Sequence, residues 1–181
     1  MNFCVSIPAI IITGMGYPSV DCRRLLKFIS SELMVPTVGL FDYNVDGWSI
    51  FCTFKFGGAR LSKNAMEFST TSLQWLGMLR IFFLGERARN QLCIMGVCTL
   101  LGLCFGDIEF VNVPPAALAS LSRRDLARLD KLATYFSEQN YPFGCEELRR
   151  MRLFGKKVEI QQAADFLSAV FPQKLLRHDF R

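Results

Sequence analysis

The sequence has little of what builds a zinc site or a secretory leader. It contains one histidine, His178, and its seven cysteines are scattered with no C-x-x-C pair. Structural zinc sites need four closely spaced cysteine or histidine ligands, so this pattern argues against one. The N-terminal stretch has no basic segment ahead of its apolar residues and no small-residue cleavage site. We therefore predict a strand there and no signal peptide.

The chain also lacks internal repeats, low-complexity tracts and a strong excess of charge. Its 181 residues suffice for one globular domain, and about half are apolar, including 17 phenylalanines, which is a folding composition. The net charge of +5 favours a polyanionic partner such as nucleic acid, although an excess of this size is also common on ordinary proteins. Composition alone therefore leaves the function open.

The first forty residues predict a strand, a helix and a second strand. The apolar, β-branched run Ala9–Thr13 ends in a glycine turn, which predicts a strand buried on both faces. Ser19 can then cap a helix that Pro36 ends, and Thr37–Phe41 predicts a second buried strand. The inward face of this helix is predicted at Cys22, Leu25, Ile29 and Leu33. Such a unit is a parallel βαβ crossover, so the predicted fold class is α/β.

Further elements follow along the chain. Trp48–Phe56 predicts a helix, although its aromatic residues would also suit a strand, and Ser72–Gly77 and Asp107–Pro114 look extended. The last third predicts amphipathic helices at Ser122–Phe136, Cys145–Phe154 and Lys156–Phe171. Their inward residues are predicted to be Leu126, Leu129, Ala133, Phe136, Leu148 and Met151, and their outward residues include Arg149, Arg150 and Arg152.

One apolar segment fits this scheme poorly. Asn90–Gly106 carries no charged residue, yet it is just short of the roughly 18 apolar residues that a membrane span requires. It can be read as a membrane span, as a buried core segment, or as an insertion into the domain.

Acidic and amide side chains alternate in the stretch LFDYNVDGW, from Leu40 to Trp48. Ligands of open parallel sheets collect beyond the carboxyl ends of the strands, where Asp42 would lie. A carboxylate there, an oxygen ligand at Asn44 and a glycine at Gly47 suit Mg²⁺, which needs only one or two protein carboxylates. The chemistry implied is phosphoryl transfer.

Two simpler interpretations of the same stretch stay open. Asn44 can form a local turn, and Asp46 can cap the helix that starts near Trp48. A calcium loop is excluded, because Thr53 stands where such a loop has its glutamate.

Several motifs in register resemble one family. The motifs are IIITGMGYPSVDCRRLL, VGLFDYNVDGWSIFCTFKFGGARL and LQWLG, followed near the end by ELRRMRLFGKKVEIQQA and FLSAVFPQKLLRHDFR. In this order they are similar to the Toprim domain and final helices of the A-type topoisomerase VI protein and its meiotic double-strand-break relatives, the sporulation-protein-eleven type. The resemblance covers most of residues 7–78 and 107–181. It implies a Toprim, Rossmann-like parallel-sheet domain with C-terminal amphipathic helices.

The resemblance also implies residue roles. The family's metal motif falls on Asp42 and Asn44, which would bind Mg²⁺, with Asp46 as an extra acid. Lys55, Tyr17 and Gly16 would lie near double-stranded DNA. Because an asparagine replaces a charged ligand, we expect weaker ion binding unless Asp46 compensates.

The family is a type II DNA topoisomerase-like isomerase, ATP-dependent in its complex, in which a tyrosine becomes linked to a DNA 5′ phosphate. That tyrosine belongs to a winged-helix domain upstream of Toprim, which we expect this chain to lack, along with the glutamate that ends the first Toprim strand. Tyr17, Tyr43, Tyr135 and Tyr141 match none of its surroundings, so we assign no catalytic residue. We expect residues 1–181 to be one Toprim-type domain, truncated at its N-terminus.

The apolar stretch then has a further explanation. Relatives pass within a few residues from WLG to a DIE-like step, whereas Leu79–Phe105 intervenes here, as an insertion of this lineage or a translated intron. The resemblance thus implies the Toprim portion of a nuclear, topoisomerase VIA-like transesterase that makes meiotic double-strand breaks. Its expected partners are DNA, a second copy of itself and a topoisomerase VI B-type subunit, with no membrane. The alternative is a catalytically inactive Toprim-like module for DNA binding or dimerisation.

Overall fold

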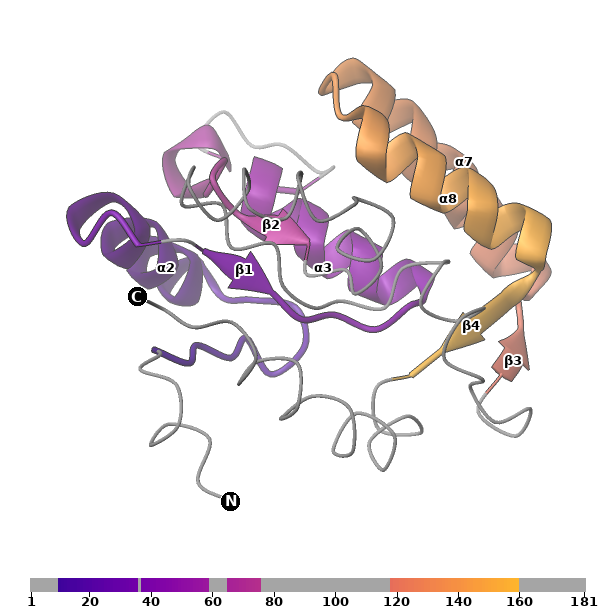
Figure 1. The fold of residues 1–181 in the computed structure, drawn as a ribbon, viewed down its shortest axis with the longest axis horizontal. Helices are drawn as coiled ribbons and strands as arrows, with labels where there is room; N and C mark the ends of the chain where they lie inside the picture. The colour runs from indigo at the N-terminus through magenta and orange to yellow at the C-terminus, as the bar shows by residue number, and fades with distance from the viewer. Residues whose placement is uncertain (1–9, 36, 59–64, 76–117, 160–181) are drawn as a thin grey trace, which may run out of the picture.

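The computed structural model of the protein describes residues 10–35, 37–58, 65–75 and 118–159 (Figure 1). Its elements are α2 (Val20–Glu32), β1 (Val38–Gly39), α3 (Val45–Phe56), η1 (Ala65–Phe68), β2 (Gln74–Trp75), β3 (Leu118–Ser120), α7 (Arg123–Glu138), α8 (Pro142–Phe154) and β4 (Lys156–Val158). Helix α2 lies at one end of the molecule and the α7–α8 pair at the other, with β1, β2 and α3 between them (Figure 1). The segments predicted at 90–106, 107–114 and 160–171 lie outside the described residues.

Two small sheets accompany the helices. Strands β1 and β2 are parallel, with Val38 opposite Gln74 and Gly39 opposite Trp75. Strands β3 and β4 are antiparallel, with Ala119 opposite Lys157. The described part of the fold therefore mixes helices with strands and contains a parallel pair, as an α/β chain should. The strand predicted at 72–77 is confirmed at β2.

Helix α2 begins where its cap predicts. The Ser19 hydroxyl accepts a hydrogen bond from the Cys22 amide at 3.2 Å. Its predicted inward face is wrong in part, because Leu25 is 50% exposed and Leu33 is 54% exposed. The predicted Cys22 does pack against the core, together with Leu26, which the predicted face did not include. These two residues form an i, i+4 row along the helix.

The first predicted strand is wrong over its described residues. Residues 10–13 form no strand, and Ile10 and Ile11 are exposed. The second is shorter than predicted and not buried, since β1 covers only Val38–Gly39 and both Val38 and Leu40 are largely exposed. A strand buried on both faces needs covering layers and neighbours at both edges. Among the described strands, β1 pairs with β2 alone.

The core lies between α3, β2 and the α7–α8 pair. Helix α3 confirms the helix predicted at 48–56, but it begins earlier, at Val45. The fully buried Trp48 stacks on Trp75 with ring centroids 3.8 Å apart and an interplanar angle of 10°. Phe136 of α7 meets Trp48 edge-on at 5.8 Å. Aromatic packing therefore joins the parallel strands to the C-terminal helices.

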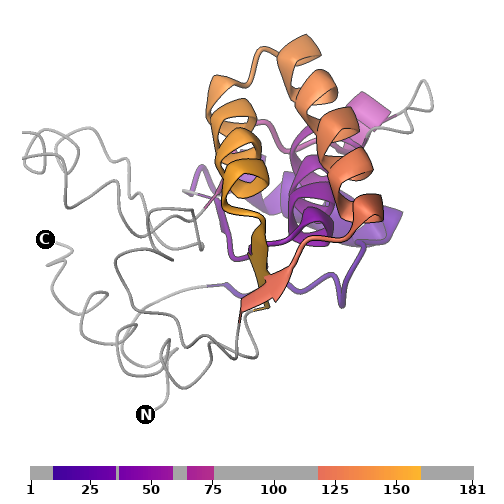
Figure 2. The same ribbon diagram turned by 90° about the vertical axis from the view of Figure 1, so that its right-hand side faces the viewer.

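Helices α7 and α8 confirm two of the predicted amphipathic helices. They pack side by side, and their buried residues include Leu129, Phe136, Leu148 and Met151 (Figure 2). The third predicted helix is wrong at its start, because Lys156–Val158 is strand β4. Gly155 ends α8 with φ of 68°, a left-handed conformation that glycine adopts without strain. The next residues then pair with β3, so tertiary pairing overrides their helical pattern.

None of the helices in the described ranges has the length and apolar character needed to cross a membrane.

Candidate functional site

The acidic stretch forms the connection from β1 to α3, beyond the carboxyl end of β1. Tyr43 is fully buried there, and its backbone carbonyl accepts a hydrogen bond of 2.9 Å from the Val158 amide of β4. A single bridge of antiparallel type thus joins this loop to β4. The loop is held by a strand more than a hundred residues away in sequence, so its position depends on the C-terminal part of the chain.

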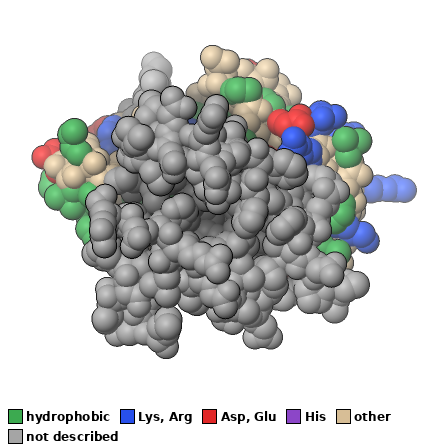
Figure 3. All heavy atoms as spheres, in the orientation of Figure 1, with side chains coloured by type: hydrophobic (Ala, Val, Ile, Leu, Met, Phe, Trp, Pro, Cys, Tyr) green, Lys and Arg blue, Asp and Glu red, His purple; other side chains and the backbone are tan. Residues whose placement is uncertain are grey.

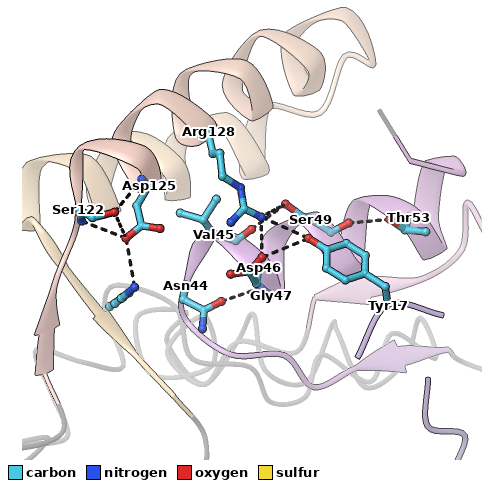
Figure 4. Close-up of polar contacts among 11 residues, drawn as sticks. Tyr17, Asn44, Val45, Asp46, Gly47, Ser49, Thr53, Ser122, Asp125 and Arg128 are labelled. Carbon is cyan, nitrogen blue, oxygen red and sulfur yellow. Dashed lines mark hydrogen bonds and ion pairs between the residues drawn. The ribbon is translucent and has the colours of Figure 1, made fainter. Parts of the chain in front are cut away.

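Asn44 caps helix α3. Its side-chain oxygen accepts a hydrogen bond from the Gly47 amide at 2.7 Å, and the residue is only 8% exposed (Figure 4). An asparagine at this position satisfies one of the free amides of the first helical turn. The local interpretation of Asn44 is therefore confirmed, whereas Asp46 lies in the first turn and is not the cap.

Gly47 lets the helix pack closely on the loop. A side-chain carbon at this position would overlap the backbone carbonyl of Asp42. Any other residue would push the first turn of α3 away from the loop. The glycine predicted to allow a turn therefore acts by permitting close contact between Asp42 and the helix.

Asp46 joins a polar cluster with Tyr17 and Arg128 (Figure 4). The Asp46 carboxylate accepts a hydrogen bond from the Arg128 guanidinium at 2.5 Å and from the Tyr17 hydroxyl at 3.2 Å. The Arg128 guanidinium also donates to the Tyr17 hydroxyl, at 3.3 Å. The hydrogen bond from Arg128 lowers the pKa of Asp46 and raises that of Arg128 itself. Asp46 is therefore a paired carboxylate.

This cluster brings together two predicted parts of the site. Gly16 and Tyr17 lie in an exposed turn before α2, and Tyr17 is 56% exposed. The Tyr17–Asp46 hydrogen bond places the turn that we predict to meet DNA directly beside the loop that we predict to bind metal.

The loop carries two oxygen ligands of a kind that Mg²⁺ accepts. Asp42 is half-buried and offers a carboxylate, and Asn44 offers an amide oxygen that already serves as a cap. Within the described ranges no group of three or more His, Cys, Asp or Glu side chains is placed to hold a metal. Mg²⁺ tolerates such a sparse set, because water and phosphate oxygens complete its octahedral shell.

Lys55 is tied into the domain. Its ammonium donates hydrogen bonds to the backbone carbonyls of Thr71 at 2.5 Å and Leu73 at 2.7 Å. The rings of Phe51, Phe56 and Tyr141 surround it at 5.4–6.0 Å from their centroids. Burial lowers the pKa of Lys55, because the charged form loses water. The lysine therefore links the end of α3 to the approach to β2.

Acidic neighbours neutralise most of the predicted basic face. Arg149 and Arg150 pair with Glu146, and Arg152 pairs with Asp130 of the neighbouring helix. Figure 3 shows the basic and acidic side chains side by side at the α7–α8 margin of the molecule. The exposed Arg123 and Arg124, at the start of α7, form no ion pair with a residue that the structure describes.

Sequence reasoning missed the partners that α7 supplies to the site. The sequence pattern does not single out Arg128 as a site residue, yet it reaches Asp46, which is 82 positions away. Asp125 was not singled out, although it accepts hydrogen bonds from the Ser122 amide at 3.0 Å and from Lys157 at 3.1 Å (Figure 4). The Ser-x-x-Asp spacing of a capping box could have indicated the first contact. Nothing local indicates the second.

The comparisons with known proteins agree with this architecture. Residues 1–81 match the family model that describes the Toprim domain of the A-type topoisomerase 6 protein and Spo11. The class is therefore a Toprim domain. The Toprim segment of this chain belongs to the topoisomerase VIA/Spo11 family, which confirms the resemblance seen in its motifs.

The similarity to individual relatives extends beyond the Toprim segment. The chain is 29% identical to "Meiotic recombination protein SPO11" of Homo sapiens, over 96% of this chain and 39% of that protein. It is 27% identical to "Meiotic recombination protein SPO11-1" of Arabidopsis thaliana, over 97% and 43%. It is 26% identical to the A-type DNA topoisomerase 6 protein of the same plant, over 99% and 37%. The chain thus spans about two fifths of the length of these relatives.

Proposed function

We propose that this chain is the Toprim portion of a topoisomerase VIA-like DNA transesterase that makes meiotic double-strand breaks. In this proposal Asp42 and Asn44 bind Mg²⁺, and Gly16, Tyr17 and Lys55 contact duplex DNA. The homologues support this proposal, because they are named as meiotic recombination proteins and a topoisomerase component. Toprim domains typically bind Mg²⁺, which supports the cofactor.

The observation that carries the proposal is the Tyr17–Asp46 hydrogen bond of 3.2 Å. It joins the exposed turn before α2 to the acidic loop after β1, so an anionic polymer that lies along the turn would meet the loop. Bound at this loop, Mg²⁺ would supply positive charge against a DNA phosphate. Asp42 and Asn44 would hold the ion, and Asn44 would also hold the start of α3 in place beside it.

Lys55 can serve two purposes in this arrangement. An ammonium group has three N–H donors, and the carbonyls of Thr71 and Leu73 take two of them. In this proposal the third donates to a phosphate oxygen. Arg123 and Arg124 add exposed charge at the start of α7, so these residues extend the proposed DNA contact.

The wider assembly belongs to the same proposal. Residues 1–181 would act as one Toprim-type domain, with Leu79–Phe105 as an insertion. The partners would be a second copy of the chain and a topoisomerase VI B-type subunit, in the nucleus.

Titration calorimetry with Mg²⁺ tests the metal site. We expect saturable binding by the parent chain and loss of most of it in Asp42→Asn, because the substitution removes the one carboxylate of the donor set. Asp21→Asn is the matched control, since Asp21 is an exposed acid on α2 whose carboxylate pairs with Arg24 of the same helix. Equal Mg²⁺ binding by Asp42→Asn and the parent would refute the metal site.

The alternative function is a catalytically inactive Toprim-like module for DNA binding or dimerisation. The specific observation that favours it is that Asn44 and Asp46 already have partners within the domain. An unchanged Mg²⁺ response in Asp42→Asn, together with salt-sensitive DNA binding, would identify this alternative.

A further inference from the structure

Among the described residues of α7 and α8, Arg128 differs from the other paired arginines, because its acid lies outside these two helices. Arg149 and Arg150 pair with glutamates of their own helix, one turn away. Arg128 leaves α7 and reaches the first turn of α3, although Asp125 precedes it by one turn. Asp125 is already engaged by Ser122 and Lys157, so it does not compete for this guanidinium.

The contact is close and partly shielded from water. One terminal nitrogen of Arg128 lies within hydrogen-bond distance of three oxygens, on Asp46 at 2.5 Å, Tyr17 at 3.3 Å and Ser49 at 3.5 Å (Figure 4). The Arg128 side chain is 31% exposed and that of Asp46 is 55% exposed. Because an arginine stays charged at every working pH, this contact places a permanent positive charge on the acidic loop.

We propose that Arg128 is an internal counter-cation of the acidic loop and competes there with Mg²⁺. This inference rests on the proposed metal site. A divalent ion near Asp42 is repelled by the guanidinium, and Asp46 can join its ligands only after leaving Arg128. The extra acid therefore does not compensate for the missing charge at Asn44 while the pair is intact. Arg128 instead ties the loop to α7 and weakens its hold on cations.

The test is Mg²⁺ calorimetry on the full chain with Arg128→Gln, Asp46→Asn and the double variant. An exposed ion pair contributes up to about 1 kcal/mol, so we expect Arg128→Gln to bind Mg²⁺ about fivefold more tightly than the parent. Asp46→Asn alone should weaken Mg²⁺ binding, because Arg128 then lies beside the loop without its acid, and the double variant should keep only the part of the gain that comes from removing the repulsion. Arg124→Gln is the matched control, because it removes an arginine from the same helix that has no acid partner among the described residues.

The outcomes separate the inference from the proposed function. If the parent binds Mg²⁺ through Asp42 and Arg128→Gln binds no more tightly, the inference fails alone. If neither chain binds Mg²⁺, both fail. If only Arg128→Gln binds, the inference holds and the parent's site is masked by its own arginine. Thermal unfolding of each variant shows that the chain is folded. If Arg124→Gln also binds Mg²⁺ fivefold more tightly, the gain comes from the change in net charge alone, and the inference is overturned.

Discussion

At the scale of single residues, Asn44 has two roles that a substitution can separate. Its amide oxygen caps α3, and the same oxygen belongs to the proposed metal site. Aspartate preserves the cap and adds a charge, whereas alanine removes the oxygen altogether.

Asn44→Asp should therefore retain the stability of the parent and bind Mg²⁺ more tightly. Asn44→Ala should lose about 1 kcal/mol of unfolding free energy, the usual contribution of a cap. Urea unfolding measures stability and calorimetry measures Mg²⁺ affinity. A stable Asn44→Asp chain with no gain in Mg²⁺ affinity would separate Asn44 from the metal site and leave only its structural role.

The residues of the site were predictable to different degrees. Asp42, Asn44 and Gly47 stand together in a short motif, so a local pattern was enough to predict the Asn44 turn and the need for a glycine. The engagement of Asp46 was not predictable, because its partners Tyr17 and Arg128 come from distant parts of the chain. A local pattern reports which groups are near in sequence, and ion pairing depends on which groups are near in space.

At the scale of elements, Lys55 connects α3 to β2 through two carbonyls. We expect Lys55→Met to destabilise the chain by about 2 kcal/mol, the range for hydrogen bonds made by a charged group. If the third N–H also meets a phosphate, the slope of DNA affinity against salt should fall by about one unit. Thermal unfolding and fluorescence anisotropy with duplex DNA, measured over a range of salt concentrations, report the two effects.

Lys27→Met is the matched control for this variant. Lys27 also donates to a backbone carbonyl, that of Glu67, at 2.8 Å. It lies on α2 and belongs to neither part of the proposed site, so its loss should leave the salt slope unchanged. If Lys55→Met and Lys27→Met have the same slope as the parent, Lys55 is a structural residue only.

Elements with strong local signals were predicted well. Helices α2, α3 and α7 have capping side chains at Ser19, Asn44 and Ser122, and a cap acts within its own turn. The errors fall on strands. The helical pattern at Lys156 yields to pairing with β3, and the apolar run at Ile10 forms no strand among the described residues. Strand formation depends on partners that the local sequence does not contain.

At the scale of the whole molecule, paired carboxylates make the fold sensitive to acid. Hydrogen bonds from Arg149 and Arg150 lower the pKa of Glu146 from 4.5 to about 2. The Ser122 backbone amide and Lys157 lower the pKa of Asp125. A carboxyl group with a lowered folded pKa stabilises the protein fully above its unfolded pKa, and this contribution is lost as pH falls through the folded pKa.

We therefore expect the melting temperature to be flat near neutral pH and to fall below about pH 4.5, where carboxyl groups of the unfolded chain begin to bind protons. At pH 7, Asp125→Asn should unfold at a lower temperature than the parent, because it loses about 1 kcal/mol of capping free energy. Because the parent loses this contribution in acid, the two melting curves should converge as pH falls. Circular dichroism melts between pH 7 and pH 2 decide the point, and a constant difference across that range would contradict the assignment.

The stacked pair of Trp48 and Trp75 has a spectroscopic consequence. These are the two tryptophans of the chain, so all of its indole absorption comes from one dimer whose ring planes are nearly parallel. Strong transition dipoles at this separation couple as an exciton, and the resulting far-ultraviolet couplet reports a single place in the protein, where α3 meets β2. A label-free optical signal therefore follows the junction beside the Asn44 cap, and it vanishes when that junction separates.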